Sequence, residues 1–540
     1  MAPKISIAAV PWARWNVRSG RALALTLLVL AAVIYPTFGD RAWERLNLRN
    51  LVFDFYQRLS PRQLPRFPVV VVDIDDESLA AFGRWPWPRT RIASLVMASR
   101  RLGARAIGLD MIMPEPDNQS PHAILAERLD APESLRAAIT ALPSNDAILA
   151  ETLRRVPSVI GRAAMTDATP RDPALAQTPV VIAGAAPNSL INNEQRYAGQ
   201  LLNIPEIEAA ARGHGYLNDS RDRDGIIRFM PVLVSVHQTV APSFAVELIR
   251  MQFGQRYYQV HSDKSAIKGI QIGDFFAPLD ADGRLRLYFS SDDGQRRVSA
   301  AKILRGEMAP GAFADRIAIV GISAVGTGDL APTPIAARMD GVEIQAQTID
   351  NILSGTHLTR PIRARWIEAV ALLGLGLMLI FILSAYGPLR GAAVFFGGVV
   401  LLFLASYGSF HWVRELYDPT FPLAASSAIV LLLLIAGFSE AQQLRRESEA
   451  ALELARTESL KMAGELRAAG KIQKGMLPDP RAIKGLPRSL DFFAMLEPAQ
   501  EVGGDLYDAF MLDEHRLCFM IGDVSDKGVP AALFMAVTKA

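Results

Sequence analysis

Two short glycine–aspartate motifs near the C-terminus hold the residues best suited to chemistry. Asp505, in Gly503-Gly504-Asp505, is predicted to leave one strand, and Asp523 to end a neighbouring strand that includes residues 516–521. If the two strands form a hairpin, both carboxylates come to one end of it. Paired carboxylates make a hard-oxygen site suited to Mg²⁺ or Mn²⁺, and two such ions can activate a bridging water for attack on a phosphate. Taken singly, each motif is also a common turn sequence.

A third segment, Ile472-Gln473-Lys474-Gly475-Met476-Leu477-Pro478, precedes these motifs. Together the three segments resemble the PPM-type serine/threonine protein phosphatases of the SpoIIE-like bacterial branch. The resemblance implies that residues 471–540 form the N-terminal part of an α+β domain, a β-sandwich flanked by helices. It also implies that Asp505 and Asp523 bind two Mn²⁺ or Mg²⁺ ions, with the carbonyl of Val524 as a further ligand. Asp526 stands where many relatives have glycine.

The resemblance covers only the first part of such a catalytic domain. Its members have further metal-binding aspartates on later strands, which we expect beyond Ala540. We therefore expect residues 1–540 to be a fragment without turnover. The apolar helix predicted around residues 531–536 would then leave apolar surface uncovered.

Four apolar runs have the length of membrane-spanning helices, at residues 22–38, 366–384, 391–412 and 419–437. Three buried helices of a soluble core are the alternative for the last three runs, and a cleavable secretory signal is the alternative for the first. Arg14, Arg18 and Arg21 precede the first run, so the positive-inside rule predicts a cytoplasmic N-terminus over residues 1–21. Residues 39–365 are then extracytoplasmic and the C-terminus is cytoplasmic, which indicates a multi-pass protein of a bacterial inner membrane. Three arginines lie on the wrong side for that rule: Arg360, Arg363 and Arg365.

The extracytoplasmic region has the pattern of a single α/β domain. Val69–Asp75 and Ala106–Asp110 are predicted strands, and the helical periodicity of Arg91–Leu102 between them suggests a parallel pair joined by a crossover. Further strands are predicted at residues 180–183, 225–236, 284–289 and 316–321, and helices at residues 243–253 and 341–353.

Several segments of this region resemble CHASE-type extracytoplasmic sensor domains of the second class. They are the runs at residues 72–79, 83–89, 108–110, 222–228 and 341–347. The resemblance covers most of residues 45–357. It implies a stimulus-sensing domain followed by three transmembrane helices and a cytoplasmic output module, and it names no ligand.

Local features of the sensor region have both ligand-binding and structural interpretations. Asp73, Asp75 and Asp76 could hold a cation, but carboxylates after a strand more often cap the next helix. The tryptophans of Trp85-Pro86-Trp87 could stack on a ligand, although a turn packed on the core is favoured. The segment around Asp222 faintly resembles a calcium loop but lacks the later glutamate, so a turn between strands is expected. His214 and His237 are isolated, and no catalytic role is predicted for them.

Residues 438–470 have the composition of a helical connector. A weak seven-residue pattern runs through Leu452, Ala455, Ser459, Met462, Leu466 and Ala469, so both a homodimeric coiled coil and a solvated spacer remain open.

Composition limits the remaining function classes. The formal net charge of +2 gives no reason to expect nucleic acid as a partner, and the single cysteine, Cys518, excludes an internal disulfide. The predicted function is transmembrane coupling of an unknown stimulus to dephosphorylation of phosphoserine or phosphothreonine on a cytoplasmic protein. The phosphatase resemblance suggests an anti-sigma-factor antagonist as that protein. The alternative is a non-enzymatic receptor whose degenerate phosphatase-like domain binds a partner. A sensor kinase or cyclase is disfavoured, because the cytoplasmic part contains only His515 and lacks a glycine-rich phosphate loop.

Overall fold

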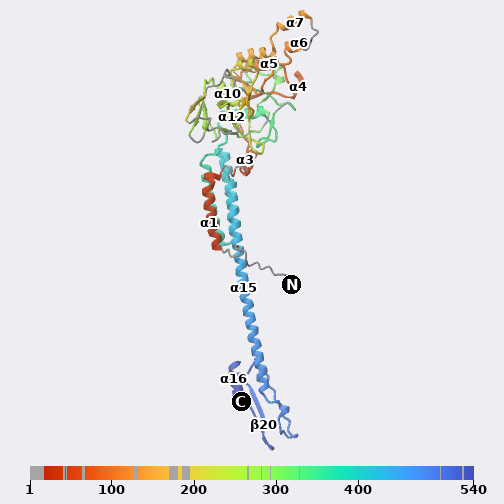
Figure 1. The fold of residues 1–540 in the computed structure, drawn as a ribbon, viewed down its shortest axis with the longest axis vertical. Helices are drawn as coiled ribbons and strands as arrows, with labels where there is room; N and C mark the ends of the chain where they lie inside the picture. The colour runs from red at the N-terminus through yellow and green to blue at the C-terminus, as the bar shows by residue number, and fades with distance from the viewer. Residues whose placement is uncertain are drawn as a thin grey trace. The chain divides into compact units, whose positions relative to one another are not determined.

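The computed structural model describes most of the chain (Figure 1). The described residues are 17–39, 43, 46–63, 67–126, 132–169, 180–184, 195–263, 267–280, 283–291, 294–326, 329–498, 500–525 and 528–540. Arg14 and Asp526 lie outside them. The chain divides into two compact units, one spanning Leu23–Leu431 and the other formed mainly by Leu432–Ala540.

A largely parallel sheet is the centre of the first unit. Its strands lie in the order β16-β1-β17-β2-β3-β6, and β7 also pairs with β3. All are parallel to their neighbours except β6, which runs antiparallel to β3. The strand bounds are β1 Val69–Ile74, β2 Ala106–Leu109, β3 Ser158–Met165, β6 Gly199–Leu201, β7 Gly213–Tyr216, β16 Arg297–Ser299 and β17 Ile317–Ile322.

Helices cover both faces of this sheet. Val69 and Val71 of β1 pack into one apolar core with α10 and α12, whereas Val70 and Val72 pack into a second core with α5, α8, α9 and α11. Because both faces are covered, β1 is hydrophobic at nearly every position rather than at alternate ones. The helices of this unit are α3 Leu48–Leu59, α4 Asp76–Phe82, α5 Arg89–Arg101, α6 Pro121–Ala126, α7 Glu133–Thr140, α8 Asn145–Arg155, α9 Pro205–Ala210, α10 Phe244–Gln252, α11 Ala300–Leu304 and α12 Gly341–Ser354.

Smaller sheets surround the central one. Among the described residues their orders are β11-β10-β5, β14-β13-β12-β4, β15-β9-β8 and β18-β19. Their bounds are β4 Val180–Ala183, β5 Arg196–Tyr197, β8 Ser220–Arg221, β9 Ile227–Pro231, β10 Leu233–Val236, β11 Thr239–Pro242, β12 Tyr258–Ser262, β13 Ile267–Ile272, β14 Phe275–Pro278, β15 Arg284–Arg286, β18 Leu330–Ala331 and β19 Met339–Asp340.

Two sequence predictions need correction here. The strands β1 and β2 are parallel, but β17 lies between them, so they are not a directly paired crossover unit. Residues 225–236 form two strands, β9 and β10, that belong to different sheets. In both cases the neighbouring strand in the sheet is distant in the chain, so the local hydrophobic pattern could not predict the pairing. The other predicted strands and helices of this region are confirmed, with shifts at their ends.

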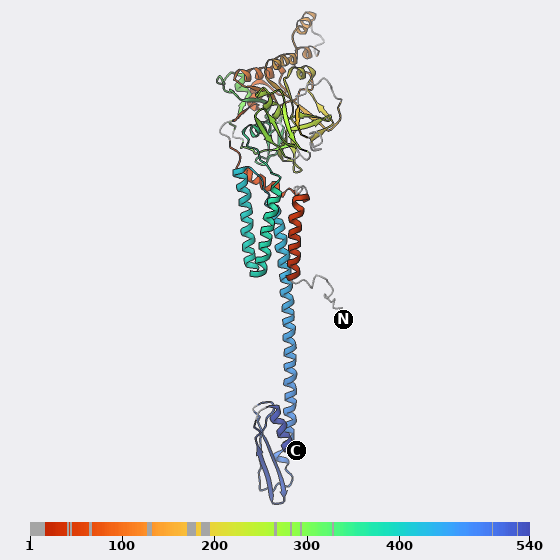
Figure 2. The same cartoon turned by 90° about the vertical axis from the view of Figure 1, so that its left-hand side faces the viewer.

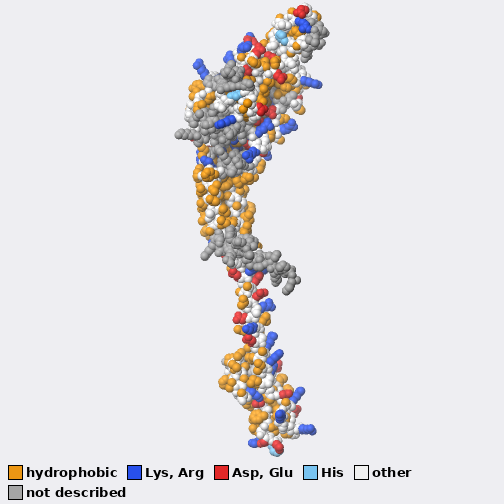
Figure 3. All heavy atoms as spheres, viewed as in Figure 1, with side chains coloured by type: hydrophobic (Ala, Val, Ile, Leu, Met, Phe, Trp, Pro, Cys, Tyr) orange, Lys and Arg blue, Asp and Glu red, His pale blue; other side chains and the backbone are white. Residues whose placement is uncertain are grey.

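Four helices within the described residues are long and apolar enough to cross a membrane. They cover Gly20–Phe38 (α1 Val17–Ile34 with the π-helical turn η2 Tyr35–Gly39), α13 Ala364–Tyr386, Pro388–Val413 (α14 Pro388–Gly408 with η5 Ser409–Val413) and the start of α15, Thr420–Met476. The outward side chains of the bundle include Leu25, Val370, Phe396 and Leu404, each between 44% and 67% exposed. Figures 2 and 3 show the side-by-side helices and their hydrophobic surface. Such a surface is suited to lipid rather than to water.

The turn between α13 and α14 is shorter than the predicted polar break at residues 386–390. Gly387 alone separates the two helices, and its φ of 85° lies in the left-handed region that glycine adopts without strain. Pro388 then begins α14, where the missing N–H of proline costs no helical hydrogen bond.

A buried polar cluster joins the segments at the sensor-side end of the bundle. Glu368 of α13 is 3% exposed and accepts hydrogen bonds from the Tyr35 hydroxyl (2.7 Å), the Arg360 guanidinium (2.7 Å) and the Asp418 backbone N–H (2.6 Å). Arg363 forms an ion pair with Glu415. Two of the three arginines that conflict with the positive-inside rule are therefore neutralised by nearby carboxylates.

The fourth apolar run and the predicted connector form one helix. α15 runs from Thr420 to Met476, so the helix continues past both predicted boundaries, at residues 437 and 470 (Figure 1). The residues of the weak seven-residue pattern lie on this helix, and Leu452 and Met462 are 71% and 60% exposed.

The C-terminal segment contains a hairpin and a short helix. A short 3₁₀ turn at Pro480–Ala482 comes first. β20 Leu506–Asp513 then pairs antiparallel with β21 Arg516–Gly522, and α16 Val529–Lys539 follows the hairpin. Leu533, Phe534 and Val537 of α16 are between 64% and 76% exposed, whereas Ala531 and Met535 of the same helix are buried.

Candidate functional site

The register of the C-terminal hairpin brings the two predicted metal ligands together. Leu506 pairs with Gly522, so Asp505 and Asp523 are the next residues outward on the two strands. Residues directly opposite in an antiparallel pair direct their side chains to the same face. Both side chains are exposed at the open end of the hairpin.

The two carboxylates are close enough to influence each other. A hydrogen bond with Asp523 raises the pKa of the Asp505 carboxyl above its ordinary value, and the charge of Asp523 acts in the same direction. Two like charges in such proximity favour either a shared proton or a bound cation. A divalent cation would relieve this repulsion more completely than one proton.

Gly504 allows the chain to approach the carbonyl of Val524. A Cβ atom at Gly504 would lie 2.7 Å from the Val524 oxygen and 3.2 Å from the Ala531 side chain, both too close for an ordinary contact. The glycine before Asp505 thus lets the Val524 carbonyl lie against the backbone of Gly504, which a side chain at this position would prevent.

The third motif segment fixes the loop that carries Asp505. Gln473 is 5% exposed, and its side chain accepts a hydrogen bond from the Gly503 N–H at 3.1 Å and donates one to the Gly503 carbonyl. The hydroxyl of Tyr507 donates to the Pro478 carbonyl at 3.1 Å. All three motif segments therefore meet in space.

The donor set fits part of a divalent-cation site. Two carboxylates and one backbone carbonyl are hard oxygen ligands of the kind that Mg²⁺ and Mn²⁺ take. Within the part of the chain that the structure describes, no group of three or more His, Cys, Asp or Glu side chains could hold a metal ion. The described site is thus a two-carboxylate site.

An apolar cavity adjoins the carboxylate pair. It has a volume of about 610 Å³, and its wall combines Asp505 and Asp523 with aromatic and aliphatic side chains. Phe493, Phe519 and Ile521 in this wall are 80%, 66% and 86% exposed.

The acidic residues in and after the end of β1 act structurally. Asp75 is the N-cap of α4 and accepts a hydrogen bond from the Ser78 N–H at 2.8 Å, so the capping interpretation is confirmed. Asp73 forms an ion pair with Arg297 at 3.3 Å. Trp87 is 1% exposed in the second core, which confirms the packed turn.

The loop around Asp222 has a role that the sequence reading missed. Gly225 donates to the Asp222 carbonyl, which confirms the turn between β8 and β9. The carboxylates of Asp222 and Asp224 each lie 2.7 Å from the guanidinium of Arg228, which also binds Asp54 of α3. Burial opposes the charge on Arg228, but the hydrogen bonds that its guanidinium donates to these carboxylates raise its pKa above the ordinary value. In the sequence, the closely spaced charges of Asp222-Arg223-Asp224-Gly225 could have indicated that this loop forms ion pairs.

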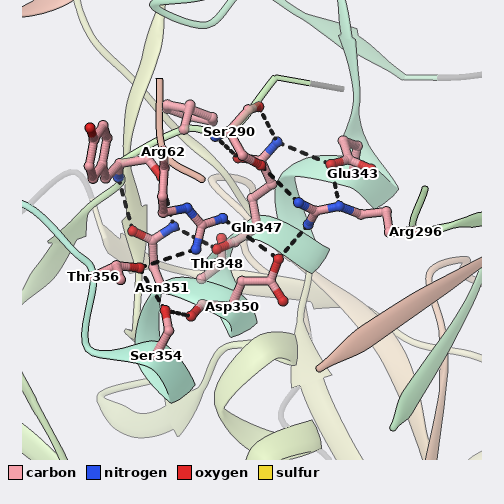
Figure 4. Close-up of polar contacts among 12 residues, drawn as sticks. Arg62, Ser290, Arg296, Glu343, Gln347, Thr348, Asp350, Asn351, Ser354 and Thr356 are labelled. Carbon is pink, nitrogen blue, oxygen red and sulfur yellow. Dashed lines mark hydrogen bonds and ion pairs between the residues drawn. The ribbon is translucent and has the colours of Figure 1, made fainter. Parts of the chain in front are cut away.

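One face of α12 carries a buried polar network (Figure 4). Asp350 binds Arg296 at 2.5 Å and lies 3.6 Å from Arg62, and Arg296 also lies 3.2 Å from Glu343. Gln347 accepts from the Ser290 N–H at 2.8 Å. Burial raises the pKa of Asp350 and lowers that of Arg62 to about 10. Glu343, Gln347, Asp350 and Ser354 are separated by four, three and four residues, so they lie on one face of a helix. This spacing could have indicated the polar face of α12 from the sequence.

The two histidines singled out in the sequence lie in structural positions. His214 is 8% exposed, its Nε2 lies 2.9 Å from the Glu208 carbonyl, and burial lowers its pKa. His237 contacts the Thr169 carbonyl at 2.8 Å.

Comparison with known proteins identifies the larger part of the chain. The model of the CHASE2 domain family matches residues 24–384. Protein IcfG of Synechocystis sp. is 44% identical over 75 residues, which is 14% of this chain and 11% of IcfG, so the chain spans only a small part of that relative's length. No solved structure matches. With its mixed α/β domain and long apolar helices, the chain is a membrane protein with a sensor domain, and it belongs to the CHASE2 family.

Proposed function

We propose that this protein couples an extracytoplasmic stimulus to metal-dependent dephosphorylation of phosphoserine or phosphothreonine on a cytoplasmic regulatory protein. The CHASE2 domain supports membrane signal transduction. The phosphatase output rests on one observation in particular: Gln473, Gly504, Asp505, Asp523 and Val524 meet at the open end of the β20–β21 hairpin.

In this proposal Asp505, Asp523 and the Val524 carbonyl hold Mn²⁺ or Mg²⁺. Two such ions, when bound, would lower the pKa of a coordinated water and so would supply hydroxide for attack on a phosphate near neutral pH. Gln473 keeps the Asp505 loop in position. Waters and the substrate phosphate would complete the coordination, because Mg²⁺ usually keeps several waters and takes only one or two carboxylates from the protein.

The proposed partner is a cytoplasmic phosphoprotein, of which an anti-sigma-factor antagonist is the type suggested by the phosphatase resemblance. The proposed location is a bacterial inner membrane, with residues 39–365 outside, both termini in the cytoplasm, and a homodimer formed through α15. The polar cluster around Glu368 supports the placement of residues 39–365 outside, since it neutralises Arg360, which conflicts with the positive-inside rule.

A second candidate function is partner binding without hydrolysis. It is favoured by the exposed apolar side chains beside the carboxylate pair, with Phe493, Phe519 and Ile521 at least 66% exposed. Such a surface is suited to a protein partner.

Hydrolysis of a phosphoserine peptide across a Mn²⁺ titration distinguishes these functions. The protein is compared with its Asp523→Asn variant and with Asp513→Asn, which changes an aspartate at the other end of the same hairpin. The phosphatase proposal expects Mn²⁺-dependent turnover that is lost in Asp523→Asn and kept in Asp513→Asn. Absence of Mn²⁺-dependent turnover in the unaltered protein, or full activity of Asp523→Asn, would contradict the phosphatase proposal.

A further inference from the structure

The sensor domain contains a cavity at the carboxyl ends of its central strands. Its volume is about 550 Å³, within the range of small-molecule sites. Asp110 directly follows β2, Ile322 ends β17, and Gly341 begins α12, so three central elements contribute to the wall. In open α/β sheets, ligands bind in the crevice beyond the carboxyl ends of the strands.

The wall of this cavity has an apolar part and a charged part. Met111, Leu217, Met230 and Val342 are among the apolar side chains, and the indole of Trp85 lies beside them. The charged side chains are Asp110, Asp219, Arg221 and Asp329. Three carboxylates therefore face one guanidinium.

The guanidinium of Arg221 is already paired. Its Nε lies 2.9 Å from Asp219, and its Nη2 lies 3.7 Å from Asp329. Asp110, in contrast, has no side-chain hydrogen bond or ion pair to another described residue. Burial, and the nearby charge of Asp329, raise the pKa of Asp110 to about 7. This is the behaviour of a carboxylate that lacks its cation.

A second unpaired group lines the same cavity. Gln345 of α12 is 4% exposed, and its Nε2 donates to the Leu217 carbonyl at 3.2 Å, which sets the orientation of the amide. Its Oε1 is buried and accepts no hydrogen bond from the described residues. A buried acceptor without a donor costs about 1–3 kcal/mol in general, so a ligand that brings a donor is favoured.

These observations decide the ligand class. An anion is disfavoured by the three carboxylates, and the positive end of the α12 dipole offsets only about half a charge. A metal ion is disfavoured because, over the described residues, no three acidic or histidine side chains lie close enough together to hold one. We propose that the cavity between Asp110, Gln345 and Trp85 binds a small organic ammonium compound with an apolar body, as the stimulus of the sensor domain.

In this site Asp110 pairs with the ammonium group, Gln345 Oε1 accepts a hydrogen bond, and the apolar body packs on Met111, Leu217 and Val342. The first turn of α12 lines the cavity, and later residues of the same helix bind Arg62, in the chain that leads from the first apolar helix. Occupancy of the cavity therefore acts on a helix that is bonded to the membrane-proximal chain. This site is independent of the proposed phosphatase output.

The test is calorimetric titration of the full chain in lipid nanodiscs at pH 8, with empty nanodiscs as the reference. The probes are 2-phenylethylammonium, 2-phenylethanol and 3-phenylpropionate, which share an apolar ring and differ in charge. We expect only the ammonium compound to bind, with at least tenfold weaker binding to Asp110→Asn and several-fold weaker binding to Gln345→Leu. Asp315→Asn, which changes an exposed aspartate of the same domain, leaves binding unchanged.

The isosteric change at Asp110 preserves the shape of the site, so loss of binding in a folded variant reports the missing charge. Equal binding of the ammonium compound to wild type and Asp110→Asn would overturn the proposal. Preferential binding of the alcohol or the carboxylate, or binding of none of the three probes, would overturn it as well.

Discussion

Arg228 of β9 and Asp54 of α3 form an ion pair that is almost completely shielded from solvent. The guanidinium Nη2 lies 2.7 Å from Asp54 Oδ2, and the two side chains are 0% and 3% exposed. Asp222 and Asp224 complete the surroundings of the same guanidinium. The pair therefore joins the helix that follows the first membrane span to a sheet of the sensor domain.

Replacement of Arg228 by methionine should strongly destabilise the sensor domain. The change leaves three carboxylates close together without their cation, and removal of one partner of a buried pair costs about 3–5 kcal/mol. Denaturant unfolding of the full chain in detergent measures this loss. Arg105→Met is the control, because its pair with Asp315 is exposed and should contribute less than about 1 kcal/mol. Equal losses in the two variants would contradict a special role for Arg228.

The stability of the sensor domain should depend on Asp110 in a defined direction of pH. The folded pKa of about 7 lies above the ordinary value of 3.8, so the folded state binds a proton more readily than the unfolded state. The contribution of Asp110 to stability is therefore fully present below pH 4 and is lost as the pH rises to 7. Asp110→Asn lacks this loss, so its melting temperature relative to wild type should rise between pH 4 and pH 7 and then level off. A difference that is constant with pH would contradict the shift.

Mn²⁺ should bind weakly to the 540-residue chain through Asp505 and Asp523. Two carboxylates that repel each other gain a shared cation, whereas Asp523→Asn keeps the shape and removes one charge. Electron paramagnetic resonance of free Mn²⁺ measures the bound fraction. We expect at least a tenfold loss of affinity in Asp523→Asn and no change in Asp513→Asn. An equal affinity in all three chains would show that this hairpin is not the metal site.

Reporter fusions should place residues 200 and 460 on opposite sides of the membrane. The expectation follows from Arg18 and Arg21 before the first span and from the four candidate spans. A phosphatase reporter active only outside and a fluorescent reporter active only inside give complementary signals at the two sites. Both fusions on one side would refute the four-crossing arrangement.

Dimerisation through α15 should appear as a seven-residue period of disulfide crosslinking. Cysteine at Leu452, Ala455, Ser459 or Met462 lies along the expected seam, whereas cysteine at Leu454 lies on the opposite face of the helix and serves as a control. Leu452 and Leu454 are similarly exposed, at 71% and 72%, so a difference between them reports the partner helix rather than accessibility. Equal crosslinking at both positions would make this stretch a solvated spacer.

The sequence by itself was sufficient for features that depend on near neighbours. The apolar runs, the buried strand Val69–Ile74 and the cap at Asp75 follow from periodicity and from residue type, and the structure contains each of them. The motif spacing likewise predicted that Asp505 and Asp523 lie at one end of a hairpin, because a single turn determines that register.

Only the tertiary structure decided the relationships between distant segments. The insertion of β17 between β1 and β2, the pairing of Arg228 with Asp54, and the cavity that joins Asp110 to Gln345 all bring together residues far apart in the chain. Such contacts produce no periodic pattern in the local sequence, because the partner of each side chain is determined by how distant segments pack together. The continuous helix α15 is a related case. The composition changes at the end of the apolar run, but the hydrogen-bonded backbone continues, because Phe438–Met476 contains no proline and is rich in strong helix formers.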